Sequence, residues 1–131
     1  MDYQKTILYW LEGAKMEMDV AEVLFREKRY SSCLFWCHLV VEKLIKAHVV
    51  SHTKTQAPYS HNLAQLAEMT GLEFSEEQKK ALAEMSEFNL MGRYPDELME
   101  FNAKCTPAFS KQYFSFTKTL YQWLLKEIPS Q

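Results

Sequence analysis

The most apolar stretch of the chain runs from Leu34 to Val50 and predicts a buried helix. With successive residues about 100° apart, apolar side chains point in almost every direction around this helix. One face contains Leu34, Cys37, Val41, Leu44, Ile45 and His48, whereas Trp36, Val40 and Ala47 lie on nearly the opposite face. Two apolar faces need two coverings. We expect the chain's own core to supply one, and a partner subunit is a candidate for the other.

An amphipathic helix precedes this stretch. Apolar residues recur every three or four positions from Tyr3 to Arg26, which predicts a long first helix with a charged outer face. A polar break follows, and Ser31 or Ser32 is a candidate N-cap for the buried helix. That helix should fade in the polar segment 51–60.

Helix-capping residues mark two further helices. Ser60 is a candidate N-cap for a short helix over His61–Thr70. Ser75 and Gln78 have the spacing of a capping box, and the helix that they open carries apolar residues as far as Met91.

The C-terminal part contains one break and one more helix. Gly92 and Pro95 together predict an end or a sharp kink, followed by an irregular path to Lys104. Thr106 as N-cap and Pro107 at the first helical position then open a last helix with an apolar and aromatic stripe. No segment alternates apolar and polar residues over strand length. The pattern therefore predicts an all-α fold, an up-and-down bundle of four long helices plus one short helix, as a single domain over residues 1–131.

Composition restricts the classes of function. A net charge of −2 and an isoelectric point near 6.1 argue against nucleic-acid binding through a broad positively charged surface, so we expect no DNA partner. The buried helix is interrupted by polar residues and is too short to span a membrane. The N-terminal residues lack the apolar core of a signal peptide, which favours a cytoplasmic location.

The three cysteines are expected to be reduced thiols. Cys33 and Cys37 lie within the apolar helix, where a thiol behaves as a small hydrophobic group. Metal binding by these two residues with His38 is the weaker interpretation, because no second ligand pair with zinc-site spacing is present. The sequence therefore gives no reason to expect a metal or another cofactor.

Several short motifs occur together on this succession of helices. They are Trp10 and Ala14 on the first helix, Tyr30 followed by His38-x-x-x-Glu42-Lys43-x-x-Lys46-Ala47, then His61-x-Leu63, and the tripeptide Arg93-Tyr94-Pro95. In this order and separation, the motifs resemble the HEPN domain family over approximately Tyr3 to Leu125. The resemblance implies a helical bundle that usually dimerises, is often encoded beside a minimal nucleotidyltransferase, and is associated with nucleotide binding.

The resemblance also implies a ribonuclease motif that this chain lacks. Many family members cleave RNA without metal, using an Arg followed after four to six intervening residues by a His. After Arg93 those positions hold Leu98, Met99 and Glu100, and no His follows His61. Such cleavage needs a group that exchanges a proton near neutral pH, which His does and an ordinary Glu does not. We therefore expect no catalytic residue here, although a ribonuclease with a non-standard site around Arg93 remains an alternative.

Six polar residues are candidates for ligand binding: His38, Glu42, Lys43, Lys46, Arg93 and Tyr94. In the functional interpretation, the cationic groups line a groove that accepts a nucleotide phosphate. In the structural interpretation, Glu42 and Lys46 form an i,i+4 pair, and His38, the Trp10 N–H or the Tyr94 hydroxyl supplies further hydrogen bonds. His61 is expected to have a local hydrogen bond or packing role.

These expectations favour an interaction protein over an enzyme. The leading hypothesis is a non-catalytic HEPN module that forms a homodimer and binds a nucleotide-like ligand, RNA or a minimal nucleotidyltransferase, in a two-gene system of the toxin–antitoxin kind. The second hypothesis is the non-standard ribonuclease. The third is a dimeric scaffold with no ligand site.

Overall fold

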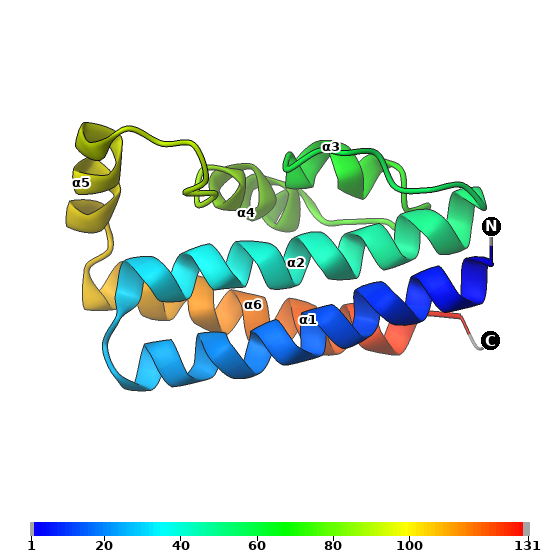
Figure 1. Ribbon diagram of the computed structural model, residues 1–131, viewed down its shortest axis with the longest axis horizontal. Helices are drawn as coiled ribbons and strands as arrows, with labels where there is room; N and C mark the ends of the chain where they lie inside the picture. The colour runs from blue at the N-terminus through cyan, green and yellow to red at the C-terminus, as the bar shows by residue number, and fades with distance from the viewer. Residues whose placement is uncertain (1, 130–131) are drawn as a thin grey trace.

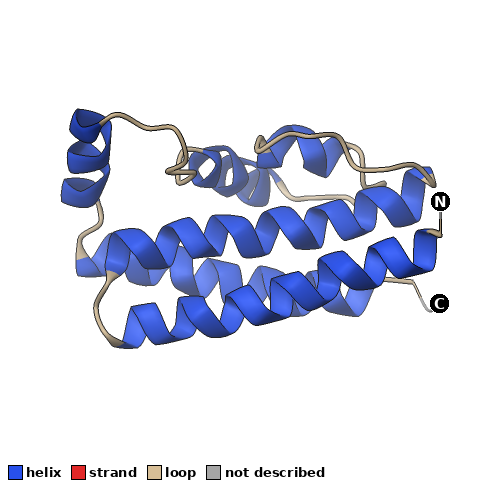
Figure 2. Ribbon diagram, in the orientation of Figure 1, coloured by secondary structure: helices blue, strands red, loops and turns tan. Residues whose placement is uncertain are grey.

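The computed structural model describes residues 2–129, and within that range the regular structure is entirely helical (Figure 2). The helices are α1 (Tyr3–Arg26), α2 (Tyr30–Thr53), α3 (Leu63–Glu68), α4 (Glu76–Ser86), α5 (Pro95–Lys104) and α6 (Pro107–Glu127). The predicted all-α bundle is therefore confirmed.

Helix α2 is the centre of the bundle (Figure 1). Helices α1 and α6 run along its length on one side, α3 and α4 cover another side, and α5 stands at one end of the bundle. Each of these five helices packs against α2. The arrangement follows from the sequence, because α2 is the only helix of the six with apolar residues on every side.

The chain itself covers most of both apolar faces of α2. Leu34 and Leu44 on one face are fully buried, and so are Val40 and Ala47 on the opposite face. Trp36, also on the opposite face, is half-buried. Most of the second face is therefore removed from water within one chain.

Helix ends follow the predicted capping residues in two places. Ser75 and Gln78 form the predicted capping box at the start of α4, and Gln78 also accepts a hydrogen bond from the Ser75 backbone. At the start of α6, Thr106 accepts a hydrogen bond from the Phe109 N–H, and Pro107 occupies the first turn.

Other helix ends differ from the prediction. The N-cap position of α2 is Arg29, so the Ser31 and Ser32 caps are wrong, and that helix continues through the polar residues as far as Thr53. Asn62, not Ser60, caps α3 through a hydrogen bond from the Gln65 N–H. Tertiary packing extends α2 beyond what local propensity indicates, whereas α3 is shorter at both ends than the predicted His61–Thr70.

The segment after Gly92, predicted to be irregular, contains α5. Helix α4 ends at Ser86 rather than near Met91, and α5 begins directly at Pro95. Pro is tolerated there because the first turn of a helix has no partner for its N–H groups. The Glu97 side chain caps the first turn of α5 by accepting a hydrogen bond from the Tyr94 N–H. The bundle thus contains one short helix more than the sequence pattern predicted.

None of the helices within residues 2–129 combines the length and the apolar character that crossing a lipid bilayer requires.

Candidate functional site

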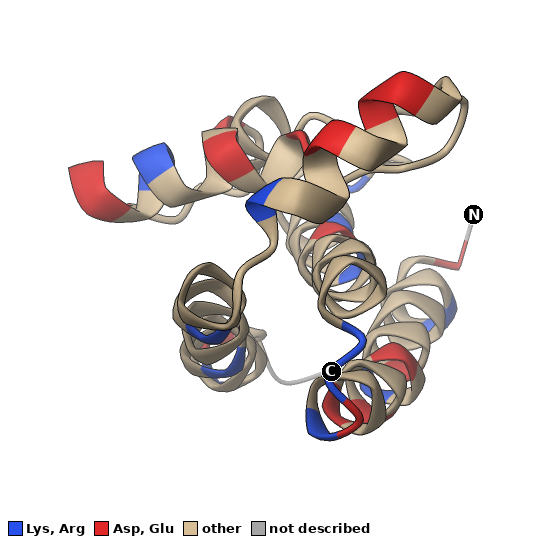
Figure 3. Cartoon of the chain, turned by 90° about the vertical axis from the view of Figure 1, so that its left-hand side faces the viewer, with Lys and Arg blue, Asp and Glu red and all other residues tan. Residues whose placement is uncertain are grey.

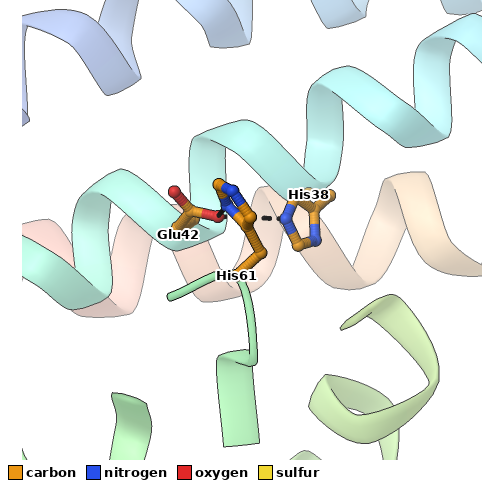
Figure 4. Close-up of side chains that lie close together, drawn as sticks. All are labelled: His38, Glu42 and His61. Carbon is orange, nitrogen blue, oxygen red and sulfur yellow. Dashed lines mark hydrogen bonds and ion pairs between the residues drawn. The ribbon is translucent and has the colours of Figure 1, made fainter. Parts of the chain in front are cut away.

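Three polar side chains from successive turns of α2 meet one side chain from the loop before α3. Figure 4 shows two of the three, His38 and Glu42, with His61 from the loop. His38, Glu42 and Lys46 are spaced four residues apart, so they share one side of α2. His61 approaches from the segment that leads into α3, and its ring lies beside the carboxylate of Glu42. We call these four residues the Glu42 cluster.

Three nitrogen atoms lie within hydrogen-bond distance of the Glu42 carboxylate. Its Oε1 atom lies 3.1 Å from His38 Nε2 and 2.8 Å from His61 Nδ1, and its Oε2 atom lies 3.0 Å from Lys46 Nζ. Burial alone would raise the pKa of Glu42, but hydrogen bonds from His38, His61 and Lys46 lower it to about 2. The buried carboxylate is therefore ionised throughout the neutral range. The predicted pairing of Glu42 with Lys46 is confirmed.

His38 lies between two acceptor oxygens. Its Nδ1 atom is 3.1 Å from the backbone carbonyl of Met85 in α4, and its Nε2 atom faces Glu42 Oε1. The carbonyl can only accept, so Nδ1 carries a proton and donates. The ring is fully buried, and this bond fixes its orientation while it ties α4 to α2.

Lys46 also contacts an aromatic ring of α1. Its Nζ atom lies 5.4 Å from the centroid of the Trp10 ring, within the range of a cation–π interaction. Trp10 does not donate to Glu42 as one interpretation suggested, because its buried Nε1 atom has no hydrogen-bond partner in the described part of the chain. Trp10 instead covers the ammonium group with its ring face.

Lys43 lies outside the cluster. Its Nζ atom donates to Glu17 of α1, so it links α2 to a different helix. The lysine stem crosses α1 at Gly13, where an added Cβ would lie 3.1 Å from Lys43 Cδ. Gly13 therefore leaves room for this side chain to lie across the helix.

Arg93 belongs to a third group, at the turn between α4 and α5. Its guanidinium donates to the backbone carbonyls of Asn89 and Glu87 at 3.1 and 3.0 Å. It also contacts the carboxylates of Glu87 and Glu97 at 3.3 and 3.5 Å. Tyr94 is the N-cap residue of α5 and is exposed. The six predicted residues thus separate into three groups, of which His38, Glu42 and Lys46 are joined directly.

His61 is the residue whose position the sequence did not predict. Its bond to Glu42 spans 19 residues of sequence, rather than the local contact expected. Tyr59, which is almost fully exposed, contacts the other side of the His61 ring edge-to-face, with centroids 5.4 Å apart. The only signal in the sequence was the His61-x-Leu63 motif of the family resemblance.

The cysteines are arranged as packing groups. Cys33 and Cys37 are fully buried, and the Cys33 thiol donates to the Ala21 carbonyl at 3.4 Å. A hydrogen bond with Cys37 together with burial raises the pKa of Cys33, and burial raises that of Cys105 to about 11. Such thiols are poor nucleophiles at neutral pH. Both ring nitrogens of His38 face oxygens, so His38 does not join Cys33 and Cys37 in a metal site.

The surface grooves lie away from the Glu42 cluster. One of about 430 Å³ lies between the start of α2 and α5, and another of about 860 Å³ lies between α4 and α6. Neither is lined by a member of the cluster. The cluster is a polar group inside the bundle, reached from outside through His61, whose side chain is one-third exposed.

Five helices around one central helix, with an ionic cluster on that helix, define a small all-helical domain. Residues 7–128 match the family model of the HEPN domain, so the chain belongs to the HEPN domain family. No curated protein and no solved structure matches the chain significantly.

Proposed function

We propose that this HEPN protein is a non-catalytic module that acts by binding a partner protein, a minimal nucleotidyltransferase. The observation that carries the proposal is the state of Arg93. Its guanidinium is held by Glu87, by Glu97 and by two backbone carbonyls. No His follows His61 in the chain, so Arg93 has no later His beside it to complete an RNA-cleaving pair.

The other cationic candidates are also paired inside the molecule. Lys46 is 5% exposed and donates to Glu42, and Lys43 donates to Glu17. To bind either lysine, a phosphate would have to displace the carboxylate that the lysine contacts, and that carboxylate would then lose its partner. This pairing disfavours a nucleotide or RNA ligand at these residues and favours a protein partner.

Helix α5 is the element best suited to contact such a partner. It stands at one end of the bundle and has no buried residue (Figure 1). Exposed apolar side chains in and before it are Met91, Tyr94, Leu98 and Met99. The groove of about 430 Å³ lies beside them. Contiguous exposed apolar side chains with a polar rim are typical of protein-binding surfaces.

The charge around α5 indicates which kind of partner fits. Asp96, Glu97 and Glu100 lie on α5, which faces the viewer at the top of Figure 3. Acidic groups repel the phosphates of RNA and attract basic side chains. The exposed apolar side chains of α5, surrounded by acidic groups, are therefore suited to bind a protein surface that carries basic side chains.

Tagged protein expressed in its native host cell tests this proposal. We expect a nucleotidyltransferase to co-purify and to be identified by mass spectrometry, and we expect Met99→Glu to abolish its recovery. Tyr59→Glu, in the loop before α3, is the control, since Tyr59 is 91% exposed and Met99 73%, and Tyr59 lies on neither α5 nor α1. Recovery that is unaffected by Met99→Glu, or recovery of the chain alone, would overturn the proposal.

An RNA assay tests the non-catalytic part separately. The purified protein should leave a panel of structured and unstructured RNAs intact in the presence of a metal chelator. Cleavage that survives purification and disappears in Arg93→Ala would establish the ribonuclease alternative instead.

Dimerisation is a further part of the proposal. The exposed apolar side chains of α1 are the surface we propose for a second copy. They include Leu8, Tyr9, Met16 and Val23. Light scattering at tens of micromolar protein tests this, with Met16→Glu expected to shift a dimer to monomer.

A further inference from the structure

We propose that His38, Glu42 and His61 form a binding site for a late first-row divalent cation, with Zn²⁺ as its best-fitting occupant. This inference is independent of the proposed partner binding. Its starting point is that His38 Nε2, Glu42 Oε1 and His61 Nδ1 all lie within 4.8 Å of one another (Figure 4). Two imidazole nitrogens and one carboxylate oxygen are a recurrent ligand set of zinc sites.

The separations of the three atoms suit a shared ion. Ligands bound at about 2.0–2.1 Å to a tetrahedral ion lie roughly 3.3 Å from each other. Oε1 is 3.1 Å from His38 Nε2 and 2.8 Å from His61 Nδ1. Widening these two pairs by a few tenths of an ångström, and bringing the two nitrogens, which lie within 4.8 Å of each other, to the same spacing, would admit the ion. His61 lies on a loop segment and can supply that movement.

The hydrogen bonding of His38 gives the second argument. Its Nδ1–H donates to the Met85 carbonyl, so in the neutral ring the lone pair resides on Nε2 and points at Glu42 Oε1. Two lone pairs facing each other at 3.1 Å require a proton or a cation between them. Donation of the second ring N–H to a backbone carbonyl is also the usual support of a metal-binding histidine.

Lys46 fixes the carboxylate for this role. It holds Oε2 of Glu42 and leaves Oε1 for the two imidazoles, so that Glu42 would bind through one oxygen. The ammonium group is kept in place by the Trp10 ring, away from Oε1.

Access and ligand type decide the class of cation. His61 is one-third exposed, which provides an entry path from the loop before α3. Imidazole ligands favour zinc and its neighbours over Mg²⁺ and Ca²⁺, which prefer oxygen. Three protein ligands leave one position, on the side of His61, for water. The ion would tie the loop before α3 to the central helix.

Isothermal titration of the chelator-treated full-length protein with Zn²⁺ tests the proposal. We expect saturable binding of one ion per chain, and we expect His61→Ala to weaken it by at least about tenfold. His61 is chosen because it is partly exposed, whereas His38 is fully buried and its replacement would endanger the fold. His52→Ala is the matched control, an exposed histidine of α2 outside the cluster.

Visible absorption of Co²⁺ in the same proteins gives a second readout, because bands from a low-symmetry site appear only when protein atoms bind the ion. The bands should be present in wild type and in His52→Ala and absent in His61→Ala. The proposal is overturned if wild type shows no saturable Zn²⁺ binding, if His61→Ala binds as wild type does, or if His52→Ala loses as much affinity as His61→Ala.

Discussion

Lys46 bonds one oxygen of the Glu42 carboxylate at 3.0 Å and leaves the other oxygen to two imidazoles. Both residues are buried, with 5% and 6% of their surfaces exposed. A buried pair of this kind contributes little relative to apolar residues of the same shape, yet loss of one partner alone is costly. The pair therefore makes the bundle sensitive to single substitutions on α2.

Removal of one charge from this pair should destabilise the fold. Glu42→Gln leaves the ammonium of Lys46 buried without a counter-charge, and we expect a loss of about 3 kcal/mol in the free energy of unfolding. The double variant Glu42→Gln/Lys46→Met should lose less than the sum of the two single variants, with a coupling of roughly 1–3 kcal/mol. Urea denaturation of the four proteins measures the coupling, and strict additivity would contradict it.

Substitution of Lys43 should have a smaller effect. Lys43→Met removes the partner of Glu17, but the side chains of Lys43 and Glu17 are 25% and 14% exposed, more than the 6% and 8% of Lys46 and Glu42, so less of the charge is desolvated. We expect a loss of about 1 kcal/mol, measured in the same denaturation experiment. A loss as large as that of Glu42→Gln would show that the Lys43 pair is the more important of the two.

His48 should make stability depend on pH. Burial lowers the pKa of His48 below 6.5, against smaller opposing effects of the Leu124 carbonyl and Glu127. As the pH falls through about 6.5, the unfolded His48 takes up a proton while the folded residue stays neutral, so stability falls. His48→Gln removes the titration and keeps a donor for the Leu124 carbonyl, 2.7 Å from His48 Nε2.

The comparison of wild type with His48→Gln isolates this effect, because other groups titrate equally in both. Between about pH 7.5 and about pH 5, wild type should lose more unfolding free energy than the variant, by at most about 1.4 kcal/mol per pH unit. Parallel pH profiles of the two proteins would contradict the prediction.

Phe88 should be the anchor of the α5 end. It is fully buried, and its ring lies 5.3 Å from that of Phe101, 5.8 Å from that of Phe109 and 5.1 Å from that of Tyr113. Phe88→Ala should cost about 3–5 kcal/mol, since it leaves a cavity among these rings. Phe116→Ala, at a half-buried position of α6, should cost clearly less in thermal or chemical denaturation.

Arg93 should hold the turn between α4 and α5 in place. Arg93→Lys keeps the charge but cannot reach both backbone carbonyls and both carboxylates. We expect a loss of about 1 kcal/mol in stability and faster amide hydrogen exchange in residues 89–94. Unchanged exchange in that segment would show that the turn does not depend on the guanidinium.

The sequence predicted those parts of the fold that depend on local pattern. The apolar period of α1, the capping box of α4 and the start of α6 could be predicted because each depends on the spacing of residues within a single helix. Helix α5 was missed because Gly92 and Pro95 end one helix and permit another equally well. None of its ten residues is fully buried, and its apolar pattern is short, with Phe101 packed on the core beside Phe88.

The site was predictable to the same extent. Glu42 and Lys46 are four residues apart, which is about one turn of a helix, so their pairing could be predicted from the sequence. The approach of His61 depends on how the segment between α2 and α3 folds back, and no local rule determines that. The contacts of Arg93 with Asn89 and Glu87 likewise depend on the shape of a turn.

The enclosure of α2 has a consequence for how the chain is made. Helices α1 and α2 are neighbours in sequence and can pair while synthesis continues. The side of α2 that meets α6 stays uncovered until residues 107–127 have left the ribosome. For most of its synthesis the nascent chain therefore presents an apolar helix to its surroundings, and a chain that stops before α6 is a natural substrate for chaperones and proteases.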